Sequence, residues 1–380
     1  MITKLQNLIK APKKVIGIFY RIYNYILFSL SFYTQVPLSK PTNISLTVSS
    51  VCNLRCKQCD IWKNKNNTKL TYAEIKTLIL QLKKWLGDYT LVLGGGEPFL
   101  NPDTVKIIEF ASKNSILTST NTNGTLINET KAEEIVKSGL SFINFSIDFP
   151  EGKSHDENRG VKGTFEKAVK GIELLQKNKI KLKLDHPLIF VNSIIMGKNI
   201  GKLHDLISFG RKIGLDGMSF QPLMSKWSFG GKKYDSNWYK NNDLWPKNIE
   251  EVEKGINNVT SLKKIYPDFF LQNSLSDLQQ YKKYFKEPNS YSKHSPPCAV
   301  GIKNFVIDSL GDVRLCQVFP PIGNIRSKLT PQEIWYGVRA KSQRNTIKKC
   351  KKSCRMLLCN RKRGISDFLP IVRKYFKVLS

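Results

Sequence analysis

Residues 43–62 read NISLTVSSVCNLRCKQCDIW, and they place a predicted β-strand, 43–49, directly before a group of cysteines. The cysteines follow the spacing Cys-x3-Cys-x2-Cys: Cys52, Cys56 and Cys59. Three thiolates from one short loop can hold three irons of a four-iron cluster and leave the fourth iron open. A structural zinc site wants four ligands, and the next histidine, His155, lies far along the chain. The stretch therefore favours a reactive iron–sulfur centre over a structural zinc.

Downstream of this stretch, short apolar runs alternate with longer runs that carry helix-capping signals. The predicted strands are 43–49, 90–93, 116–120, 142–147, 182–190 and 217–220. The predicted helices lie between them, at 71–86, 101–113, 129–138, 164–176 and 203–213. This alternation indicates an α/β fold with a parallel sheet and helices outside it. Because six strands are too few for a closed eight-fold barrel, we expect a partial (β/α)6 TIM-like barrel, with its chemistry at the C-terminal ends of the strands.

Glycine-rich and polar segments stand at several of these strand ends and in one later loop. They are 94–98 (GGGEP), 122–124 (TNG), 146–148 (SID) and 156–160 (DENRG). A glycine-rich turn lets the backbone approach a ligand closely, although Asn-Gly is also a good turn by itself. The Ser and Asp of 146–148 occupy alternate positions and so face the same side of a strand. The Arg of 156–160 could fork a carboxylate, with a loop salt bridge as its simpler reading.

The cysteine loop and these segments together resemble the radical S-adenosylmethionine (radical SAM) superfamily over roughly residues 43–222. The resemblance implies that the open iron binds the amino and carboxylate groups of S-adenosylmethionine. An electron from the cluster then cleaves the sulfonium and gives a 5′-deoxyadenosyl radical. Gln58 departs from the family, which often has Tyr or Phe at that position. The resemblance makes Cys52, Cys56 and Cys59 the catalytic cluster ligands. It also implies a set of cofactor-binding residues: Gly95, Gly96, Glu97, Pro98, Asn123, Ser146, Asp148 and Arg159.

Five further cysteines lie towards the C-terminal end: Cys298, Cys316, Cys350, Cys354 and Cys359. Predicted strands at 305–308 and 313–315 flank a turn, and the pattern Cys298-x12-Gly311-x4-Cys316 resembles the start of a SPASM/twitch extension of radical SAM enzymes. Five thiols suffice for one four-thiolate cluster, so we expect one auxiliary [4Fe-4S] cluster, with zinc as the alternative. The expected ligands are Cys298, Cys316 and Cys359, together with either Cys350 or Cys354.

Positive charge gathers at the two ends of the chain. Lys and Arg number 61 against 30 Asp and Glu, and this net charge of +31 predicts attraction to polyanions unless it reflects the composition of a whole proteome. Residues 1–50 hold six basic residues and no acidic one, and 341–380 hold 13 basic residues and one acidic residue. The apolar run 15–32 is interrupted by Arg21 and Asn24, so it falls short of a transmembrane span. It predicts a helix that packs on the main domain or lies in an anionic membrane interface.

The sequence divides into five parts. They are 1–40, a basic apolar segment; 41–222, the radical SAM core; 223–295, a connecting region; 296–365, a SPASM/twitch-like cluster domain; and 366–380, a basic tail. Packing, rather than substrate binding, is the expected role of the aromatic residues in the connecting region: Trp227, Trp238, Tyr239 and Trp245.

The predicted function is that of a radical SAM enzyme whose radical abstracts hydrogen from a carbon of its substrate. The substrate is a small molecule or a peptide, with a lipid or a lipid-linked sugar also open. A reductant such as ferredoxin or flavodoxin supplies the electron, and the expected location is cytoplasmic, either free or at the inner face of the membrane. The alternatives are an RNA-modifying radical SAM enzyme and a non-enzymatic metal-cluster protein that binds nucleic acid. Because no nucleophile–base pair or phosphate loop is evident, classical hydrolysis is disfavoured.

Overall fold

One sheet links most of the chain in the computed structural model, which describes residues 23, 26–34, 36–65, 67–225, 235–289, 298–350, 352 and 354. Within these residues the strands pair in the order β10-β9-β8-β1-β2-β3-β4-β5-β6-β7. The strands are β1 (Asn43–Ser49), β2 (Thr90–Gly95), β3 (Leu117–Thr122), β4 (Phe142–Phe145), β5 (Leu188–Ile195), β6 (Gly217–Pro222), β7 (Phe270–Leu271), β8 (Asn304–Ile307), β9 (Asp312–Arg314) and β10 (Gly323–Asn324).

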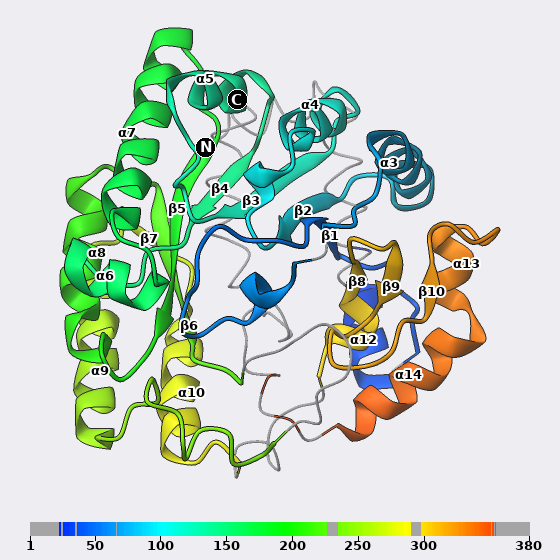
Figure 1. Ribbon diagram of the computed structural model, residues 1–380. Helices are drawn as coiled ribbons and strands as arrows, with labels where there is room; N and C mark the ends of the chain where they lie inside the picture. Colours follow the sequence, from blue (N-terminus) through cyan, green and yellow to red (C-terminus); the bar gives the residue numbers. More distant parts are fainter. Residues whose placement is uncertain are drawn as a thin grey trace, which may run out of the picture.

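Strands β1 to β7 run parallel and keep their order in the sequence, while helices cover the outer face of the arc that they form (Figure 1). The predicted partial barrel is thereby confirmed, and β7 adds a short strand beside β6. The helices are α3 (Tyr72–Leu86), α4 (Thr104–Lys113), α5 (Glu129–Lys137), α6 (Gly152–Arg159), α7 (Thr164–Leu182), α8 (Leu203–Lys212), α9 (Ile249–Ile265), α10 (Leu275–Lys286), α12 (Val300–Lys303), α13 (Pro331–Tyr336) and α14 (Val338–Lys349), with 3-10 turns η1 (Ile61–Lys63), η2 (Pro98–Leu100) and η3 (Ile200–Lys202).

Helix α3 illustrates how local signals and burial together build this arrangement. The Thr71 hydroxyl accepts a hydrogen bond from the Glu74 backbone, and the Glu74 carboxylate accepts one from the Thr71 backbone, so the predicted capping box is present. The inner face of α3 packs with Leu93 and other outward-facing strand residues in the main core. Ser45 and Val92, on the opposite face of the sheet, are only partly buried. The apolar core therefore lies between sheet and helices, and the inner face of the sheet is left for a site.

Two parts of the barrel differ from the sequence-based prediction. Helix α7 runs to Leu182 and β5 begins at Leu188, so the predicted strand at 182–190 was placed too early. The helix continues because its inner face stays buried as far as Asn178, and Lys183 then ends it in the left-handed conformation, with a φ of 55°. Helix α6 was not predicted at all, because its sequence is almost entirely polar and carries no apolar period.

The connecting region after β6 folds into α9 and α10 around a group of aromatic rings. The ring centroid of Trp245 lies between 5.1 and 5.3 Å from the centroids of four neighbours: Trp238, Tyr239, Tyr284 and Phe285. Packing is therefore confirmed as the role of Trp238, Tyr239 and Trp245, while Trp227 lies outside the described residues.

The C-terminal strands extend the same sheet at its other edge. Strand β8 pairs in parallel with β1, with Phe305 opposite Ile44, and β9 returns antiparallel to β8 around Gly311, whose φ is +85°. The strands predicted at 305–308 and 313–315 are confirmed to within one residue. Helices α13 and α14 lie beside these strands (Figure 1). The core and the tail therefore share one sheet, and a domain boundary at residue 296 stays a prediction.

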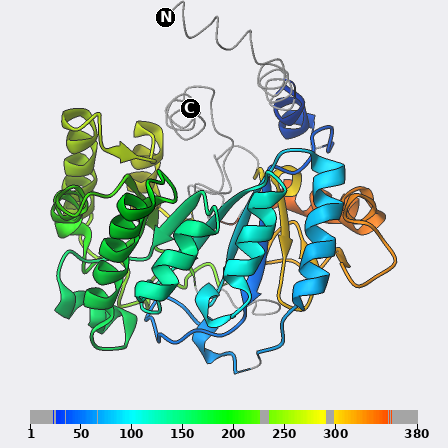
Figure 2. The ribbon, with the colours of Figure 1, turned by 90° about the horizontal axis from the view of Figure 1, so that it is seen from above.

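Residues 26–34 form a helix at the end of the molecule that carries the C-terminal elements (Figure 2). Phe28 and Phe32 of this helix are buried against Ala299 and Ile302. One face of the helix is therefore packed on the molecule, as the first of its two readings predicted. Among the described residues, no helix combines the length and the apolar character needed to cross a membrane.

Candidate active site

The cysteine loop, residues 50–60, is held between two other segments by backbone hydrogen bonds. On one side, the amide nitrogen of Gly96 donates to the carbonyl oxygen of Ser49 at 2.8 Å. On the other side, the amide nitrogen of Arg55 donates to the carbonyl oxygen of Arg159 at 3.0 Å. The GGGEP segment and the end of α6 thus fix the loop at the C-terminal end of β1, where the fold predicts the chemistry.

The three thiols of the loop lie close enough to influence one another's ionisation. Burial is the main cause that raises the pKa of Cys52 to about 11, and the neighbouring Cys56 and Cys59 add to it. Burial likewise raises the pKa of Cys59, and the nearby Arg159 acts in the opposite direction. These thiols therefore stay protonated at neutral pH by themselves, and binding of a metal centre would release their protons.

The arrangement of the thiols suits a four-iron cluster rather than a single ion. In the described part of the chain, no three Cys, His, Asp or Glu side chains converge closely enough to ligate one metal ion. Cluster ligands bind different irons, so their sulfur atoms stand farther apart than the ligands of one zinc. Cys52, Cys56 and Cys59 come from one loop and are coupled electrostatically, which fits that wider spacing.

The GGGEP segment approaches the cysteine loop so closely that only glycine fits. A Cβ atom on Gly95 would lie 2.1 Å from the carbonyl oxygen of Ser49, and a Cβ atom on Gly96 would lie 2.0 Å from that of Val51. Gly95 also has a φ of +123°, which L side chains rarely adopt. The glycines of this motif are therefore needed for the contact between the two loops.

Glu97 ties the GGGEP segment to the end of β3. Its carboxylate accepts hydrogen bonds from the Thr122 hydroxyl and the Asn123 backbone, both at 2.8 Å, and from the Phe99 backbone at 3.2 Å. Burial nevertheless raises its pKa to about 7. Pro98 follows, buried at the start of η2. The contacts of Glu97 are thus within the protein, and they fix two of the loops that the resemblance assigns to the cofactor.

Asn123 extends this network to the cysteine loop. Its side-chain nitrogen donates to Asn53 Oδ1 at 2.9 Å, and its side-chain oxygen accepts from the backbone and the hydroxyl of Thr125 at 3.0 and 2.7 Å. Ser146, at the next strand end, is partly buried, and its backbone nitrogen donates to Thr122 O at 2.9 Å. The loops that follow β1, β2, β3 and β4 are therefore joined into one unit.

Asp148 and Arg159 form a buried ion pair beside the cysteine loop. Arg159 Nη2 lies 2.7 Å from Asp148 Oδ2, and the two side chains are 8% and 0% exposed. The other terminal nitrogen of Arg159, Nη1, donates to Cys56 Sγ at 3.7 Å. Gln58 Nε2 and Asn158 Nδ2 also donate to Asp148 Oδ2, at 3.1 and 3.0 Å. The structure thus brings together three predicted site residues with two that were not predicted.

The two additional partners illustrate where sequence reasoning falls short. Gln58 stands out in the sequence only as a departure from the family's aromatic residue. A polar residue directly before the last cysteine of the loop was the one signal that could have pointed to a buried partner. Asn158 carries no such signal, because its role depends on a contact with Asp148 that forms only when α6 folds back on the end of β4.

The tail cysteines that the structure describes lie around the end of β9. Burial raises the pKa of Cys316, and Cys350 contributes to the shift, which places these two thiols near each other. Cys298 and Cys354 are both buried. Cys359 lies outside the described residues.

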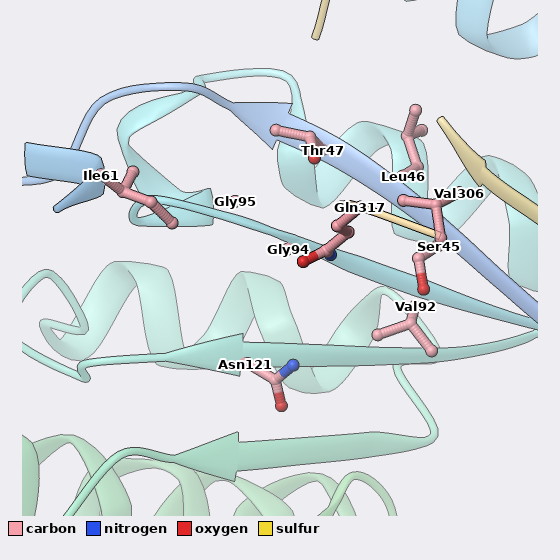
Figure 3. Close-up of a pocket in the computed structure, with 10 residues that line it drawn as sticks. All are labelled: Ser45, Leu46, Thr47, Ile61, Val92, Gly94, Gly95, Asn121, Val306 and Gln317. Atoms are coloured by element: carbon pink, nitrogen blue, oxygen red, sulfur yellow. The ribbon is translucent and has the colours of Figure 1, made fainter. Parts of the chain in front are cut away.

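A cavity of about 220 Å³ opens on the inner face of the sheet beside the GGGEP segment (Figure 3). Its walls come from β1, β2, β3 and β8, from η1 behind the cysteine loop and from Gln317 next to Cys316. Polar side chains of the lining are uncharged: Ser45, Thr47, Asn121 and Gln317. The cavity therefore connects the predicted cofactor site with the tail through a neutral surface.

Residues 46–202 match the family model of the Radical SAM superfamily. With the partial barrel and the cysteine loop, this match defines the chain as a radical SAM enzyme, a class whose cofactors are a four-iron cluster and S-adenosylmethionine. The predicted resemblance is thereby confirmed, and a non-enzymatic cluster protein is set aside.

Two curated relatives illustrate how far the similarity extends. The AdoMet-dependent heme synthase of Oleidesulfovibrio alaskensis is 28% identical over 173 residues, which cover 45% of this chain and 42% of that protein. The antilisterial bacteriocin subtilosin biosynthesis protein AlbA of Bacillus subtilis is 24% identical over 291 residues, which cover 75% of this chain and 57% of AlbA. The chain thus spans about half the length of the curated relatives it matches.

Solved structures share the fold beyond the matched domain. Streptococcus suis SuiB bound to S-adenosylmethionine superposes with a TM-score of 0.60 at 17% identity, covering 80% of this chain and 68% of SuiB. Native anSMEcpe with bound AdoMet gives a TM-score of 0.58 at 18% identity, covering 88% of this chain and 96% of anSMEcpe. At these identities the likeness concerns the fold alone.

Proposed function

We propose that this chain modifies a peptide by abstracting hydrogen from one of its carbon atoms. One observation carries the proposal: the cysteine loop, the GGGEP segment and the end of α6 are hydrogen-bonded into one unit beside an uncharged cavity. When bound, the cluster supplies the electron that cleaves S-adenosylmethionine to methionine and a 5′-deoxyadenosyl radical. The residues of the chain hold the cluster, orient the cofactor and shape the substrate cavity.

A peptide is favoured over a lipid, a lipid-linked sugar or RNA. Gln317 and Asn121 bring carboxamide groups to the cavity, and a carboxamide offers both the donor and the acceptor that a peptide group needs. SuiB, which shares the fold, has been solved bound to its precursor peptide SuiA, and AlbA takes part in subtilosin biosynthesis. The lining that the structure describes for the cavity has no cationic side chain to meet an RNA phosphate.

Anaerobic reconstitution followed by reduction tests the radical chemistry. With a chemical reductant, or with ferredoxin or flavodoxin as the proposed biological donor, we expect the wild type to form 5′-deoxyadenosine. Cys52→Ala should reduce this to background, because the cluster loses one of its three thiolates. Cys316→Ala is the matched control, since it removes a tail thiol and leaves the loop intact. A fully iron-loaded wild type that forms no 5′-deoxyadenosine would rule the function out. Peptides encoded beside the gene, analysed by mass spectrometry, then test the substrate class.

We also propose one auxiliary four-iron cluster in the tail. The nearness of Cys316 to Cys350 and the burial of Cys298 and Cys354 support it. Its proposed ligands are Cys298, Cys316 and Cys359 with either Cys350 or Cys354. Iron analysis should give about eight irons per wild-type chain and about four in Cys316→Ala. Zinc in place of the second set of irons would contradict this cluster.

The outer face of the N-terminal helix supports a cytoplasmic location at the inner face of the membrane. Large apolar side chains there are between 48% and 74% exposed: Tyr23, Ile26, Leu30 and Tyr33. They recur at helical spacing, and residues 1–50 carry basic but no acidic residues, which complements anionic lipid headgroups.

Vesicle flotation tests this location. The chain should float with phosphatidylglycerol vesicles and not with phosphatidylcholine vesicles, because both apolar burial and charge attraction are required. The double variant Ile26→Ser/Leu30→Ser should lose binding. Ile180→Ser, at a residue that is 80% exposed on α7, is the matched control and should bind like the wild type. Equal binding by the double variant would contradict the proposal.

A further inference from the structure

Arg159 divides its guanidinium between a predicted cluster ligand and a buried carboxylate. Nη1 donates to Cys56 Sγ at 3.7 Å, and Nη2 lies 2.7 Å from Asp148 Oδ2. The Arg159 side chain is 8% exposed, so water screens neither contact strongly. A hydrogen bond from a charged donor therefore reaches the ligand sulfur in a medium of low dielectric constant.

Asp148 is itself fixed by donors from other parts of the site. The backbone nitrogen of Ile194 donates to Oδ1 at 2.9 Å, while Gln58 Nε2 and Asn158 Nδ2 donate to Oδ2. The carboxylate is 0% exposed and has little freedom to turn. It therefore holds the Arg159 guanidinium in one position and links the cysteine loop, α6 and β5.

We propose, building on the function proposed above, that Arg159 is a positioning residue for the Cys56 ligand and raises the reduction potential of the site cluster. Hydrogen bonds to the sulfur atoms are among the factors that set the potential of an iron–sulfur cluster. A donor withdraws electron density from the ligand sulfur and so stabilises the reduced form, which carries one more negative charge. Because Asp148 offsets the charge of Arg159, the directional hydrogen bond carries most of the effect. Gln58, which replaces the family's aromatic residue, contributes by holding Asp148.

The resemblance implies a different role, in which Arg159 binds S-adenosylmethionine directly. Both terminal nitrogens of its guanidinium already have partners within the protein, and its buried Nε has no hydrogen-bond partner. The two roles predict different losses on substitution. A cofactor ligand lowers the affinity for S-adenosylmethionine when it is removed, whereas a positioning residue for Cys56 shifts the potential of the cluster.

A redox titration followed by electron paramagnetic resonance distinguishes these roles on the reconstituted full-length chain. The signal that Cys56→Ala abolishes identifies the site cluster and separates it from the tail cluster. Arg159→Lys keeps the charge, but one ammonium cannot reach both partners. We expect a tenfold smaller equilibrium constant for one-electron reduction, which corresponds to about 59 mV towards more negative potential. The double variant Asp148→Asn/Arg159→Gln removes both buried charges together, avoids an unpaired carboxylate and should shift the potential in the same direction.

Arg55→Gln is the matched control for charge. It removes a cation one residue before Cys56, but Arg55 is exposed, so we expect an unshifted potential. Unshifted potentials in both Arg159→Lys and the double variant, at normal iron content, overturn the proposal. Weaker binding of S-adenosylmethionine with an unshifted potential does the same and assigns Arg159 to the cofactor. A wild type without a site-cluster signal instead overturns the proposed function, and this inference with it.

Discussion

Gly160 marks the point where α6 comes closest to the cysteine loop. It ends α6 with a φ of +72°, and a Cβ atom there would lie 2.6 Å from the carbonyl oxygen of Arg55. We predict that Gly160→Ala lowers the free energy of unfolding by about 3 kcal/mol, through left-handed backbone strain and a forced displacement of the loop. That displacement also moves Arg159 away from Cys56, so iron content after reconstitution should fall. Chemical denaturation and iron analysis measure the two effects.

Gly163 is the matched control for this prediction. Its φ is +76°, but a Cβ atom there would meet no heavy atom within 4 Å. Gly163→Ala should therefore lose only the backbone contribution, about 1 to 2 kcal/mol, and keep normal iron content. Equal losses in the two variants would mean that the contact with the cysteine loop contributes nothing.

Glu97 makes the stability of the site depend on pH. Burial raises its pKa from 4.5 to about 7, so between these values the folded chain binds more protons than the unfolded chain. The stability from this group is therefore complete below pH 4.5 and decreases as the pH rises to about 7, by roughly 3 kcal/mol. Glu97→Gln does not ionise and should lack this decrease. Denaturation of the cluster-free proteins across this range measures it, and parallel curves for the two proteins would contradict the assignment.

At the scale of elements, Arg344 joins α12, α13 and α14. Its Nε and Nη2 donate to the carbonyl oxygens of Gly301 and Trp335, both at 2.8 Å, and its guanidinium lies 4.4 Å from the centre of the Trp335 ring. Burial lowers its pKa to about 10. We predict that Arg344→Lys lowers the free energy of unfolding by about 2 kcal/mol, because one ammonium leaves a buried carbonyl unpaired. Arg339→Lys, at an exposed residue of α14, should change it by less than about 0.5 kcal/mol. Thermal unfolding compares the two, and equal losses would argue against this role.

Local signals predict individual elements of this fold well. The sequence predicts β1 at 43–49 and the Thr71 capping box, and both are present, because each depends on neighbouring residues alone. The pairing of β8 with β1 leaves no such signal. Asn43 and Asn304 share a side-chain hydrogen bond of 3.0 Å but stand 261 positions apart. Only the completed barrel brings these two strands together.

The site follows the same division. The cysteine spacing and the GGGEP glycines indicate which loops meet, because their chemistry is written in short motifs. The contacts of Asp148 could not be predicted, since its partners come from the cysteine loop, α6 and β5. A side chain that resembles a cofactor ligand in sequence is, in the fold, surrounded by donors from its own chain.

At the scale of the whole molecule, the aromatic contacts of β8 join the barrel and the tail. Phe305 is 0% exposed, and its ring centroid lies 5.9 Å from that of Trp85 in α3 and 6.3 Å from that of Trp335 in α13. Because these rings come from both parts of the chain, we predict a single cooperative unfolding transition for barrel and tail. Tryptophan fluorescence and circular dichroism should report the same midpoint in denaturant. Two separated midpoints in the wild type would contradict this.

Phe305→Ala tests the same coupling from inside the sheet. Loss of the ring should lower the free energy of unfolding by about 3 to 5 kcal/mol and shift the single transition without splitting it. The reason is that the resulting cavity borders β1, α3 and α13 together, so neither part can lose its packing alone. Leu310→Ala, at a residue 46% exposed in the turn between β8 and β9, is the matched control and should change stability by about 0.5 kcal/mol at most. If Phe305→Ala instead produced an early transition of the tail with an unchanged midpoint for the barrel, the tail would be an independent unit docked on β1. The cavity wall that Gln317 provides would then depend on that docking rather than on the fold of the barrel.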